Sequence, residues 1–237
     1  MSKKQTFQVA IDGPVAAGKG TAAKQVALRL GFLYVDTGAM YRAATLLFLE
    51  KNLDLSLNNQ EQLVQELEGA DFALKNVQDT DGNFYTQVKL NGRDVSDRIR
   101  QADVDQTVST VAALPQVREV LVAKQQDLAS KHNVVMEGRD IGTRVLPNAT
   151  CKFYLTASLE VRAARRLEQQ RNLIPGITLE EVTRQIQIRD KQDQSRATDP
   201  LVVAPDAQVV DTSGETIEET VTKLLGLIRA KIAQETS

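Results

Sequence analysis

Short apolar runs alternate with longer helical patterns along most of the chain. Several of the runs are continuously apolar, which is typical of parallel strands covered by helices on both faces. Strands that alternate with helices favour right-handed strand–helix–strand units, so we predict an α/β fold with a doubly wound parallel sheet. The predicted strands are Phe7–Ile11, Phe32–Val35, Val134–Met136, Cys151–Leu155 and Gln208–Val210, and the predicted helices are Lys19–Leu30, Gly38–Lys51, Val117–Ser130, Leu159–Arg171, Leu179–Gln194 and Ile217–Ala233.

Residues 58–105 break this alternation. A short helical pattern, Glu61–Glu68, is followed by strand-like runs whose turn signals are Asp81-Gly82 and Asn91-Gly92. Turns of this kind indicate antiparallel hairpins, here over Phe72–Val77 and Phe84–Leu90. Such hairpins are marginally stable alone, so we expect them to pack on the main domain. They form either a structural flap or an arm that holds a substrate.

We therefore divide the chain into a core and an insert. The core comprises residues 1–57 and 106–237, and the insert is a small antiparallel β subdomain at residues 58–105. Within the core, a second helix–loop–helix segment at about 158–194 turns at Pro175-Gly176 and is rich in arginine.

Composition narrows the possible classes of function. With 237 residues and a net charge of −2, the chain has no overall attraction to nucleic acid or to an anionic membrane. A single cysteine, Cys151, excludes an internal disulfide and suits a reducing cytoplasm. The only histidine, His132, argues against a histidine metal site or a Ser–His pair. No run suits a signal peptide or a membrane span, so we expect a soluble, cytoplasmic protein.

The segment GPVAAGKGT, from Gly13 to Thr21, lies between the first predicted strand and the first predicted helix. This order is typical of a phosphate-binding P-loop. Glycines let backbone N–H groups turn toward an anion, and the start of the helix adds unpaired N–H groups and a positive dipole end. Lys19 would reach the β- and γ-phosphates of a nucleotide, and Thr21 would offer a hydroxyl to Mg²⁺. The alternative is an ordinary glycine turn with a solvated lysine.

One departure from the strict pattern is informative. Gly20 separates Lys19 from Thr21, whereas the strict pattern places Ser or Thr directly after the lysine. This GKGT ending resembles nucleoside monophosphate kinases and points toward small phosphate acceptors. The residues predicted to bind ATP are Asp12, Gly13, Pro14, Val15, Ala16, Ala17, Gly18, Lys19, Gly20 and Thr21.

Two further motifs follow predicted strands, where ligands of such sheets bind. In DTGAMYR, the Thr37 hydroxyl and the start of a helix could hold a polar ligand near Arg42, or Asp36 or Thr37 could simply cap that helix. In EGRDIGT, the charged Arg139 and Asp140 stand at the carboxyl end of an apolar strand. Charges placed there are costly unless they meet ligands or one another, which favours a functional role.

Arginine is concentrated in a further motif, RDKQDQSR at Arg189–Arg196, and in the earlier helical pattern Leu159–Arg171. On a helix, Arg189 and Asp193 would share a face, with Arg196 three residues later. The guanidinium group suits bidentate binding of phosphate oxygens and stays charged at any physiological pH. A solvated, salt-bridged surface is the alternative interpretation, although it is less satisfactory for the whole set, which also includes Arg162, Arg165 and Arg166.

Taken together, these motifs make the chain resemble the bacterial cytidylate kinase family, whose members phosphorylate CMP and dCMP. The resemblance rests on IDGPVAAGKGT, DTGAMYR, STVAALPQVR, EGRDIGT and RDKQDQSR, in this order and spacing. It implies a P-loop kinase core, a CMP-binding arm at residues 58–105 and a helical lid over ATP at about 158–194. It further implies pyrimidine nucleotide metabolism and Mg²⁺ as the cofactor that accompanies ATP.

The resemblance also implies a role for each matching residue. The implied CMP contacts are Ser109, Arg118 and Asp140 for cytosine, Arg42 and Arg139 for the phosphate, Arg189 and Asp193 for the ribose, and Thr37, Tyr41 and Arg196 elsewhere in the site. The implied catalytic residues are Lys19, Arg42, Arg139, Arg162 and Arg196. Chemistry agrees for cytosine, because a carboxylate accepts from its exocyclic amine while arginine and serine donate to N3 and O2.

We therefore expect in-line transfer of the γ-phosphoryl group of ATP to CMP or dCMP. The acceptor phosphate is largely ionised near neutral pH, so no strong general base is required. Adenylate, shikimate and dephospho-coenzyme A kinases remain alternatives, as does a non-catalytic nucleotide-binding switch. Nucleic acid and membranes are not expected as partners, and no long apolar surface stripe demands another subunit, so we expect a monomer.

Overall fold

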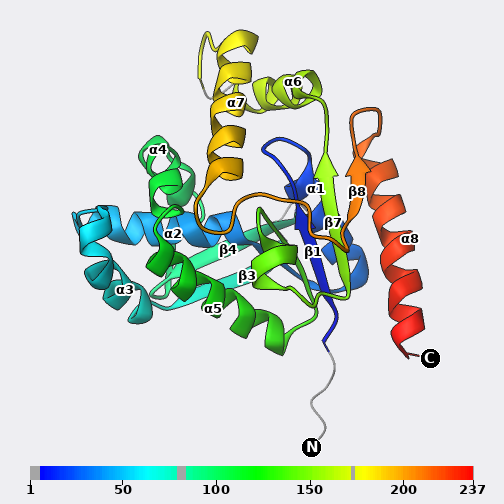
Figure 1. Ribbon diagram of the computed structural model, residues 1–237, viewed down its shortest axis with the longest axis horizontal. Helices are drawn as coiled ribbons and strands as arrows, with labels where there is room; N and C mark the ends of the chain where they lie inside the picture. Colours follow the sequence, from blue (N-terminus) through cyan, green and yellow to red (C-terminus); the bar gives the residue numbers. More distant parts are fainter. Residues whose placement is uncertain (1–5, 79–83, 172–173, 237) are drawn as a thin grey trace, which may run out of the picture. The chain divides into compact units, whose positions relative to one another are not determined.

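The computed structural model describes residues 6–78, 84–171 and 174–236 (Figure 1). These residues fall into two compact units. The first unit contains Phe32–Val134, and the second contains residues 7–31 and 135–236. A larger sheet has the strand order β2-β6-β1-β7-β8, and a smaller one has the order β3-β4-β5. The expected parallel α/β sheet and the expected small antiparallel sheet are both confirmed.

The second unit is built on parallel strands. Strand β1 pairs with β7 so that Val9 lies opposite Cys151, and β7 pairs with β8 so that Phe153 lies opposite Gln208. After its first residue β1 is buried throughout, because helices cover the sheet and exclude water from both faces. The elements are β1 (Gln8–Asp12), α1 (Lys19–Leu30), β6 (Val134–Gly138), η3 (Ile141–Val145), β7 (Cys151–Thr156), α6 (Leu159–Gln170), α7 (Leu179–Ser195), β8 (Gln208–Asp211) and α8 (Ile217–Thr236).

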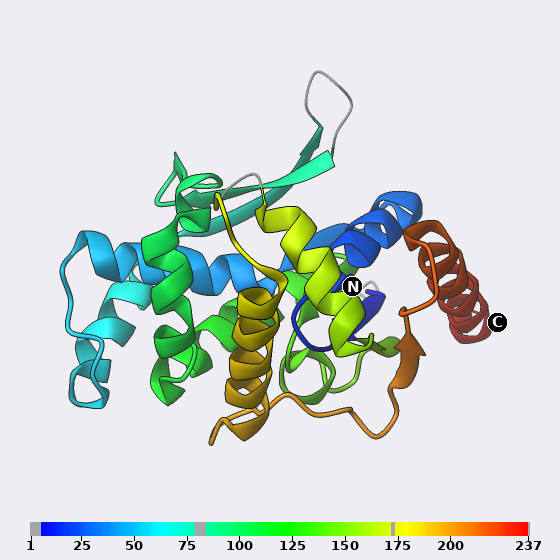
Figure 2. The same ribbon diagram turned by 90° about the horizontal axis from the view of Figure 1, so that it is seen from above.

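The first unit combines helices with the antiparallel sheet, whose long hairpin of β3 and β4 is visible in Figure 2. Val88 and Leu90 on β4 share a core with Leu63 on α3, Phe48 on α2 and Leu121 on α5. The insert thus packs on flanking helices, as its small size led us to expect. The elements are β2 (Leu33–Asp36), α2 (Thr37–Glu50), η1 (Leu57–Asn59), α3 (Gln60–Glu68), β3 (Phe72–Gln78), β4 (Phe84–Leu90), β5 (Arg93–Asp94), η2 (Arg98–Arg100), α4 (Ala102–Val111) and α5 (Pro115–Lys131).

The turn between β4 and β5 confirms one hairpin signal. Asn91 and Gly92 have φ angles of 50° and 78°, the left-handed conformations that a two-residue hairpin turn needs. The other signal, Asp81-Gly82, lies outside the described residues.

Helix α4 was not predicted. Its buried residues Val104, Val108 and Val111 follow the helical period, but all three are β-branched, which weakens the local preference for a helix. Its N-cap, Gln101, makes no side-chain capping hydrogen bond. The local sequence does not specify a helix here, and packing against α2 stabilises α4.

Two features expected from the composition can be compared with the structure. Cys151 is buried in β7, and burial raises the pKa of its thiol to about 11. This agrees with a packed strand thiol and not with a nucleophile. Among the described residues, no helix is both long enough and apolar enough to cross a membrane.

Gly13 leaves no room for a side chain. Its φ is 145°, and a Cβ atom there would lie 1.9 Å from the backbone oxygen of Leu155. We predict that Gly13→Ala lowers the free energy of unfolding by about 3 kcal/mol or more, through backbone strain and overpacking.

Gly31→Ala is the matched control for this prediction. Gly31 also has a positive φ, 66°, but a Cβ atom would meet nothing within 4 Å. Its cost should be about 1 kcal/mol, from backbone strain alone. Urea unfolding monitored by circular dichroism measures both variants, and equal losses would contradict the steric account.

Candidate active site

The P-loop lies at the end of β1 and at the start of α1. Gly18 precedes the helix in a left-handed conformation with φ of 86° and provides no side-chain cap. Gly13 and Ala16 also have positive φ angles, of 145° and 60°. This curled backbone, together with the uncapped N–H groups of a helix start, suits the binding of phosphate oxygens.

Lys19, at the first position of α1, is buried and folded back onto the loop. Its Nζ atom donates to the backbone oxygen of Pro14 at 2.7 Å. Burial and then the positive charge of Arg139 lower the pKa of its ammonium group to about 7, while Glu137 and Asp12 act in the opposite direction. Because burial disfavours the charged ammonium group, the negative charge of an incoming phosphate would stabilise it.

Asp12, the last residue of β1, connects this loop to the EGRDIGT segment. Its two carboxylate oxygens accept hydrogen bonds from the backbone N–H groups of Ile141 and Gly142 at 2.8 and 2.7 Å. Burial raises the pKa of Asp12 to about 6, although both hydrogen bonds lower it. Ile141 and Gly142 are the first two residues of the wide turn η3, which comes directly after Arg139 and Asp140.

Arg139 is brought together with two residues that the sequence analysis placed in the same site. Its Nε atom donates to Asp193 Oδ2 at 2.6 Å. The Nη2 atom of Arg196 lies 3.8 Å from the other oxygen of the same carboxylate. Burial lowers the pKa of Arg139, but Asp193 together with Glu137 and Asp190 raises it, and the net shift is upward. One carboxylate on α7 therefore faces two arginines predicted to bind the acceptor.

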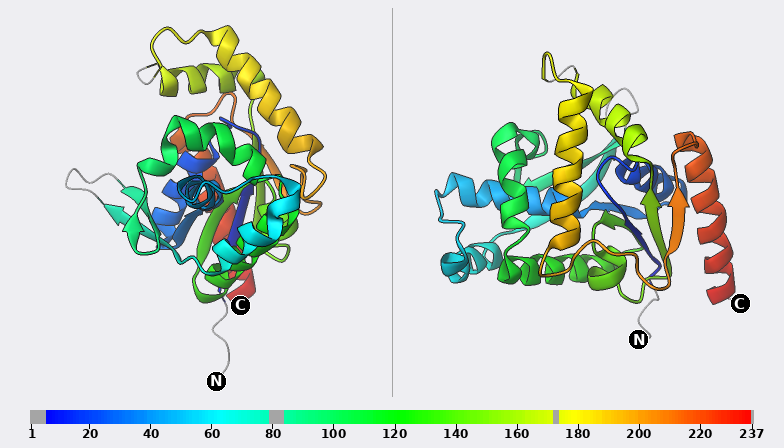
Figure 3. Two further views of the ribbon diagram at one scale, coloured as in Figure 1. Left: turned by 90° about the vertical axis from the view of Figure 1, so that its left-hand side faces the viewer. Right: turned by 45° about the horizontal axis from the view of Figure 1, so that its top comes forward.

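The segment predicted to form the lid consists of α6 and α7, which pack on each other (Figure 3). Ala163 of α6 and Val182 and Ile186 of α7 form a small apolar cluster. Ser158 caps α6 by accepting from the backbone N–H of Val161, and Thr178 forms a capping box with Glu181 at the start of α7. Local capping signals and packing thus define both helices.

Arg162 links these two helices to the P-loop. Its guanidinium group donates to the backbone oxygens of Ala157 and Val15 at 3.1 and 3.2 Å, and to Asp190 on α7 at 2.6 Å. These contacts give Arg162 a structural role, and its catalytic role stays a prediction. Arg189, one helical turn before Asp193, also lies on α7.

The first unit carries the DTGAMYR residues on α2. Asp36 is the cap of this helix and accepts from the backbone N–H of Ala39 at 3.0 Å, so of the two capping candidates it is Asp36 that acts. Thr37 and Tyr41 are buried, and Arg42 donates to Asp105 on α4 at 2.5 Å and to the backbone oxygen of Ile99 at 3.4 Å. Arg42 is thereby held in place by a carboxylate.

Arg118 is brought together with Tyr41. The Arg118 guanidinium lies 5.5 Å from the centre of the Tyr41 ring, and it donates to the backbone oxygen of Ala112 at 3.1 Å. The side chain is 1% exposed, so burial and the aromatic ring fix its orientation. Ser109 lies exposed on α4.

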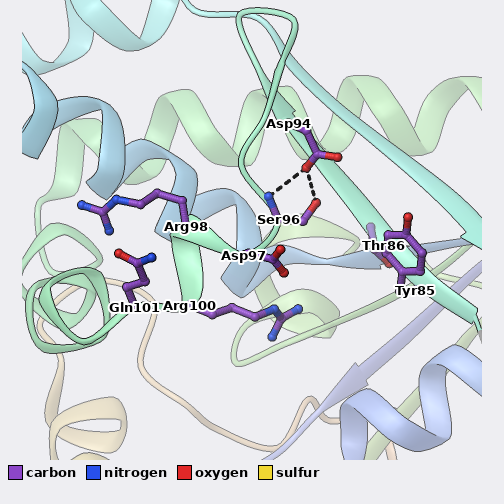
Figure 4. Close-up of a pocket in the computed structure, with 8 residues that line it drawn as sticks. All are labelled: Tyr85, Thr86, Asp94, Ser96, Asp97, Arg98, Arg100 and Gln101. Atoms are coloured by element: carbon purple, nitrogen blue, oxygen red, sulfur yellow. Dashed lines mark hydrogen bonds between the residues drawn. The ribbon is translucent and has the colours of Figure 1, made fainter. Parts of the chain in front are cut away.

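A pocket of about 770 Å³ lies within the insert, and none of the predicted site residues lines it (Figure 4). Arg98 is paired with Asp103, and Asp94 accepts from both the backbone N–H and the hydroxyl of Ser96. The lining residues are Tyr85, Thr86, Asp94, Ser96, Asp97, Arg98, Arg100 and Gln101.

Sequence reasoning missed the carboxylate partners of two site arginines. Asp105 holds Arg42, and Asp190 holds Arg162. Asp190 lies within the RDKQDQSR motif, which was a usable signal, whereas no motif pointed to Asp105.

The P-loop is the part of the site that could bind the expected Mg²⁺ ion. Thr21 is exposed in the first turn of α1, and its hydroxyl is of the oxygen type that Mg²⁺ prefers. The described residues contain no group of three or more His, Cys, Asp or Glu side chains that could hold a metal ion. A metal at Thr21 would therefore depend on nucleotide phosphate oxygens and water as further ligands.

The glycine-rich loop, its buried lysine and the parallel sheet define a P-loop nucleotide-binding protein. The family model described as cytidylate kinase matches residues 9–230, and the chain belongs to this family. The sequence motifs left adenylate, shikimate and dephospho-coenzyme A kinases as alternatives. Membership in the cytidylate kinase family decides against these three.

Individual relatives agree. The chain is 47% identical over 224 residues to a cytidylate kinase of Caldanaerobacter subterraneus subsp. tengcongensis, covering 94% of this chain and 95% of that protein. It is 46% identical over 233 residues to a cytidylate kinase of Limosilactobacillus fermentum, covering 97% and 98%. A solved structure of an uncharacterized protein from Eubacterium ventriosum, 11% identical with a TM-score of 0.50, covers 95% of this chain and 99% of that one and shares the fold.

The contacts of Arg162 generate a stability prediction. Arg162→Ala would leave the Asp190 carboxylate, whose side chain is 14% exposed, without this partner. We predict a loss of about 3 kcal/mol in the free energy of unfolding and faster hydrogen exchange in α7.

Arg171→Ala is its control, because Arg171 at the end of α6 pairs with Glu168 in water. Exposed pairs contribute little, so urea unfolding should show almost no change. If both variants unfold alike, Arg162 does not link the two helices.

Proposed function

We propose that the protein transfers the γ-phosphoryl group of ATP to CMP or dCMP, giving CDP or dCDP and ADP. The observation that carries this proposal is identity of 46–47% with cytidylate kinases over nearly the whole chain. The P-loop and the arginines held beside it fit a phosphotransferase. We place the activity in pyrimidine nucleotide metabolism in the cytoplasm, with the protein acting as a monomer.

Catalysis in this proposal comes from positioning and charge. An acceptor phosphate has a second pKa of about 6, so it attacks as an ionised group and no residue has to remove a strongly held proton. Lys19 would leave the Pro14 oxygen and bind the donor phosphates. Mg²⁺, bound through Thr21 with ATP, would supply further positive charge for the phosphate oxygens.

The arginines would bind the acceptor by exchanging one anion for another. Arg42 and Arg139 now donate to Asp105 and Asp193. A guanidinium group has five N–H donors, so each arginine can bind phosphate oxygens while keeping part of its aspartate contact. We assign Arg189, Asp193 and Arg196 to the acceptor nucleotide as well, and the α6–α7 pair to a lid that excludes water.

We further propose that Ser109, Arg118 and Asp140 recognise cytosine. The carboxylate would accept from the exocyclic amine, while the other two side chains donate to N3 and O2. Uracil presents a carbonyl oxygen and an N–H at two of these positions. Each buried group then left unpaired costs about 1–3 kcal/mol, which favours cytosine.

The acceptor is tested by a coupled assay of ADP release with CMP, dCMP, UMP, AMP and shikimate in parallel. We predict turnover with CMP or dCMP, and kcat/KM for UMP lower by at least about tenfold because of the unpaired groups. The ratio of dCMP to CMP turnover shows how far the ribose contacts select the sugar. Turnover of AMP or shikimate without CMP would overturn the proposal.

The phosphate-binding roles are tested by Lys19→Ala and Arg139→Ala. Removal of one preorganised donor typically lowers kcat by about 10²–10³-fold, and we predict losses of this size for both variants. Lys131→Ala serves as a control, because its exposed side chain pairs with Asp127 one helical turn away on α5, outside the proposed lid. Near-normal turnover in either variant would remove the role assigned to that residue.

A further inference from the structure

Asp12 directly precedes the P-loop in the sequence, but its side chain contacts a different segment. Both of its hydrogen bonds that involve backbone N–H groups go to η3, at Ile141 and Gly142. Asp12 is 5% exposed, so water competes little for its carboxylate. A carboxylate that accepts two backbone hydrogen bonds fixes the position of the peptide that donates them.

The segment that Asp12 fixes carries two of the proposed acceptor residues. Arg139 and Asp140 join β6 to η3, and they directly precede Ile141, the first residue of η3. Gly142 fits tightly against the same carboxylate, since a Cβ atom there would lie 3.3 Å from Asp12 Oδ2 and 3.2 Å from Lys152 Cδ. The turn therefore has little freedom to move while Asp12 is present.

We infer that Asp12 is a positioning residue for the acceptor nucleotide, which holds Arg139 and Asp140 in place through the backbone of Ile141 and Gly142. This inference rests on the proposed function and changes one part of it, because the sequence pattern assigned Asp12 to ATP. Asp12 acts through the turn and need not touch either nucleotide.

Two variants test this from opposite sides of the contact. Asp12→Asn replaces one carboxylate oxygen with an amide NH2 group, which donates and cannot accept, so one of the two backbone N–H groups loses its acceptor. Gly142→Ala keeps the charge of Asp12 and pushes the turn away from it by a few tenths of an ångström. We expect KM for CMP to rise about tenfold or more in Asp12→Asn and a few-fold in Gly142→Ala.

In both variants KM for ATP should change by less than about threefold. The double variant should be no worse than Asp12→Asn alone, because both substitutions disturb one contact. Hydrogen exchange at Ile141 and Gly142 should speed up in Asp12→Asn, which reports the turn independently of turnover. Circular dichroism and thermal unfolding establish that each variant is folded.

Matched controls come from β8, another parallel strand of the same unit. Asp211 also ends its strand and accepts from the backbone N–H and hydroxyl of Ser213, and a Cβ atom at Gly214 would meet nothing within 4 Å. Asp211→Asn and Gly214→Ala should leave KM for CMP unchanged.

A rise in KM for ATP that equals or exceeds the rise for CMP would overturn the inference, as would an unchanged KM for CMP in both variants. Additive effects in the double variant would also overturn it. Failure of the proposed function looks different, since the unsubstituted protein would then not turn over CMP at all.

Discussion

A phosphate-binding site needs positive side chains that are charged and held in place before any phosphate binds. In a partly buried site an isolated charge is unfavourable, because little water solvates it. Carboxylates meet this constraint at three of the arginines proposed to act in the site: Arg42 pairs with Asp105, Arg139 with Asp193 and Arg162 with Asp190. The aspartates lie on α4 and α7, so the packing of these helices also determines where the positive charges stand. Lys19, by contrast, rests on a backbone oxygen.

Local signals explain what the sequence predicted well. Helix α1 begins at Lys19 and ends at Leu30 as predicted, because a glycine stands immediately before and after it in the left-handed conformation. Strands β1 and β6 were recognised because most of their residues are apolar and buried. The P-loop was recognised because its glycines and lysine follow one another directly in the chain.

Contacts between distant residues explain what could not be predicted. Arg42 and Asp105 are 63 residues apart, and Arg139 and Asp193 are 54 apart, so no motif contains both partners of either pair. Asp12 was assigned by its neighbours in the chain, whereas its hydrogen bonds go to residues about 130 positions later. Helix α4 depends on packing against α2 more than on its own β-branched residues.

Two arginines of helix α6 connect it to the P-loop, one directly and one through Thr212. Besides Arg162, Arg165 donates to the hydroxyl and backbone oxygen of Thr212, and that hydroxyl lies within hydrogen-bonding distance of the Ala17 oxygen. Both arginines lie in the first two turns of a helix about 18 Å long. The helix is thus held near its first residues, so a rotation of the P-loop backbone would be transmitted to α6 and would displace its far end most.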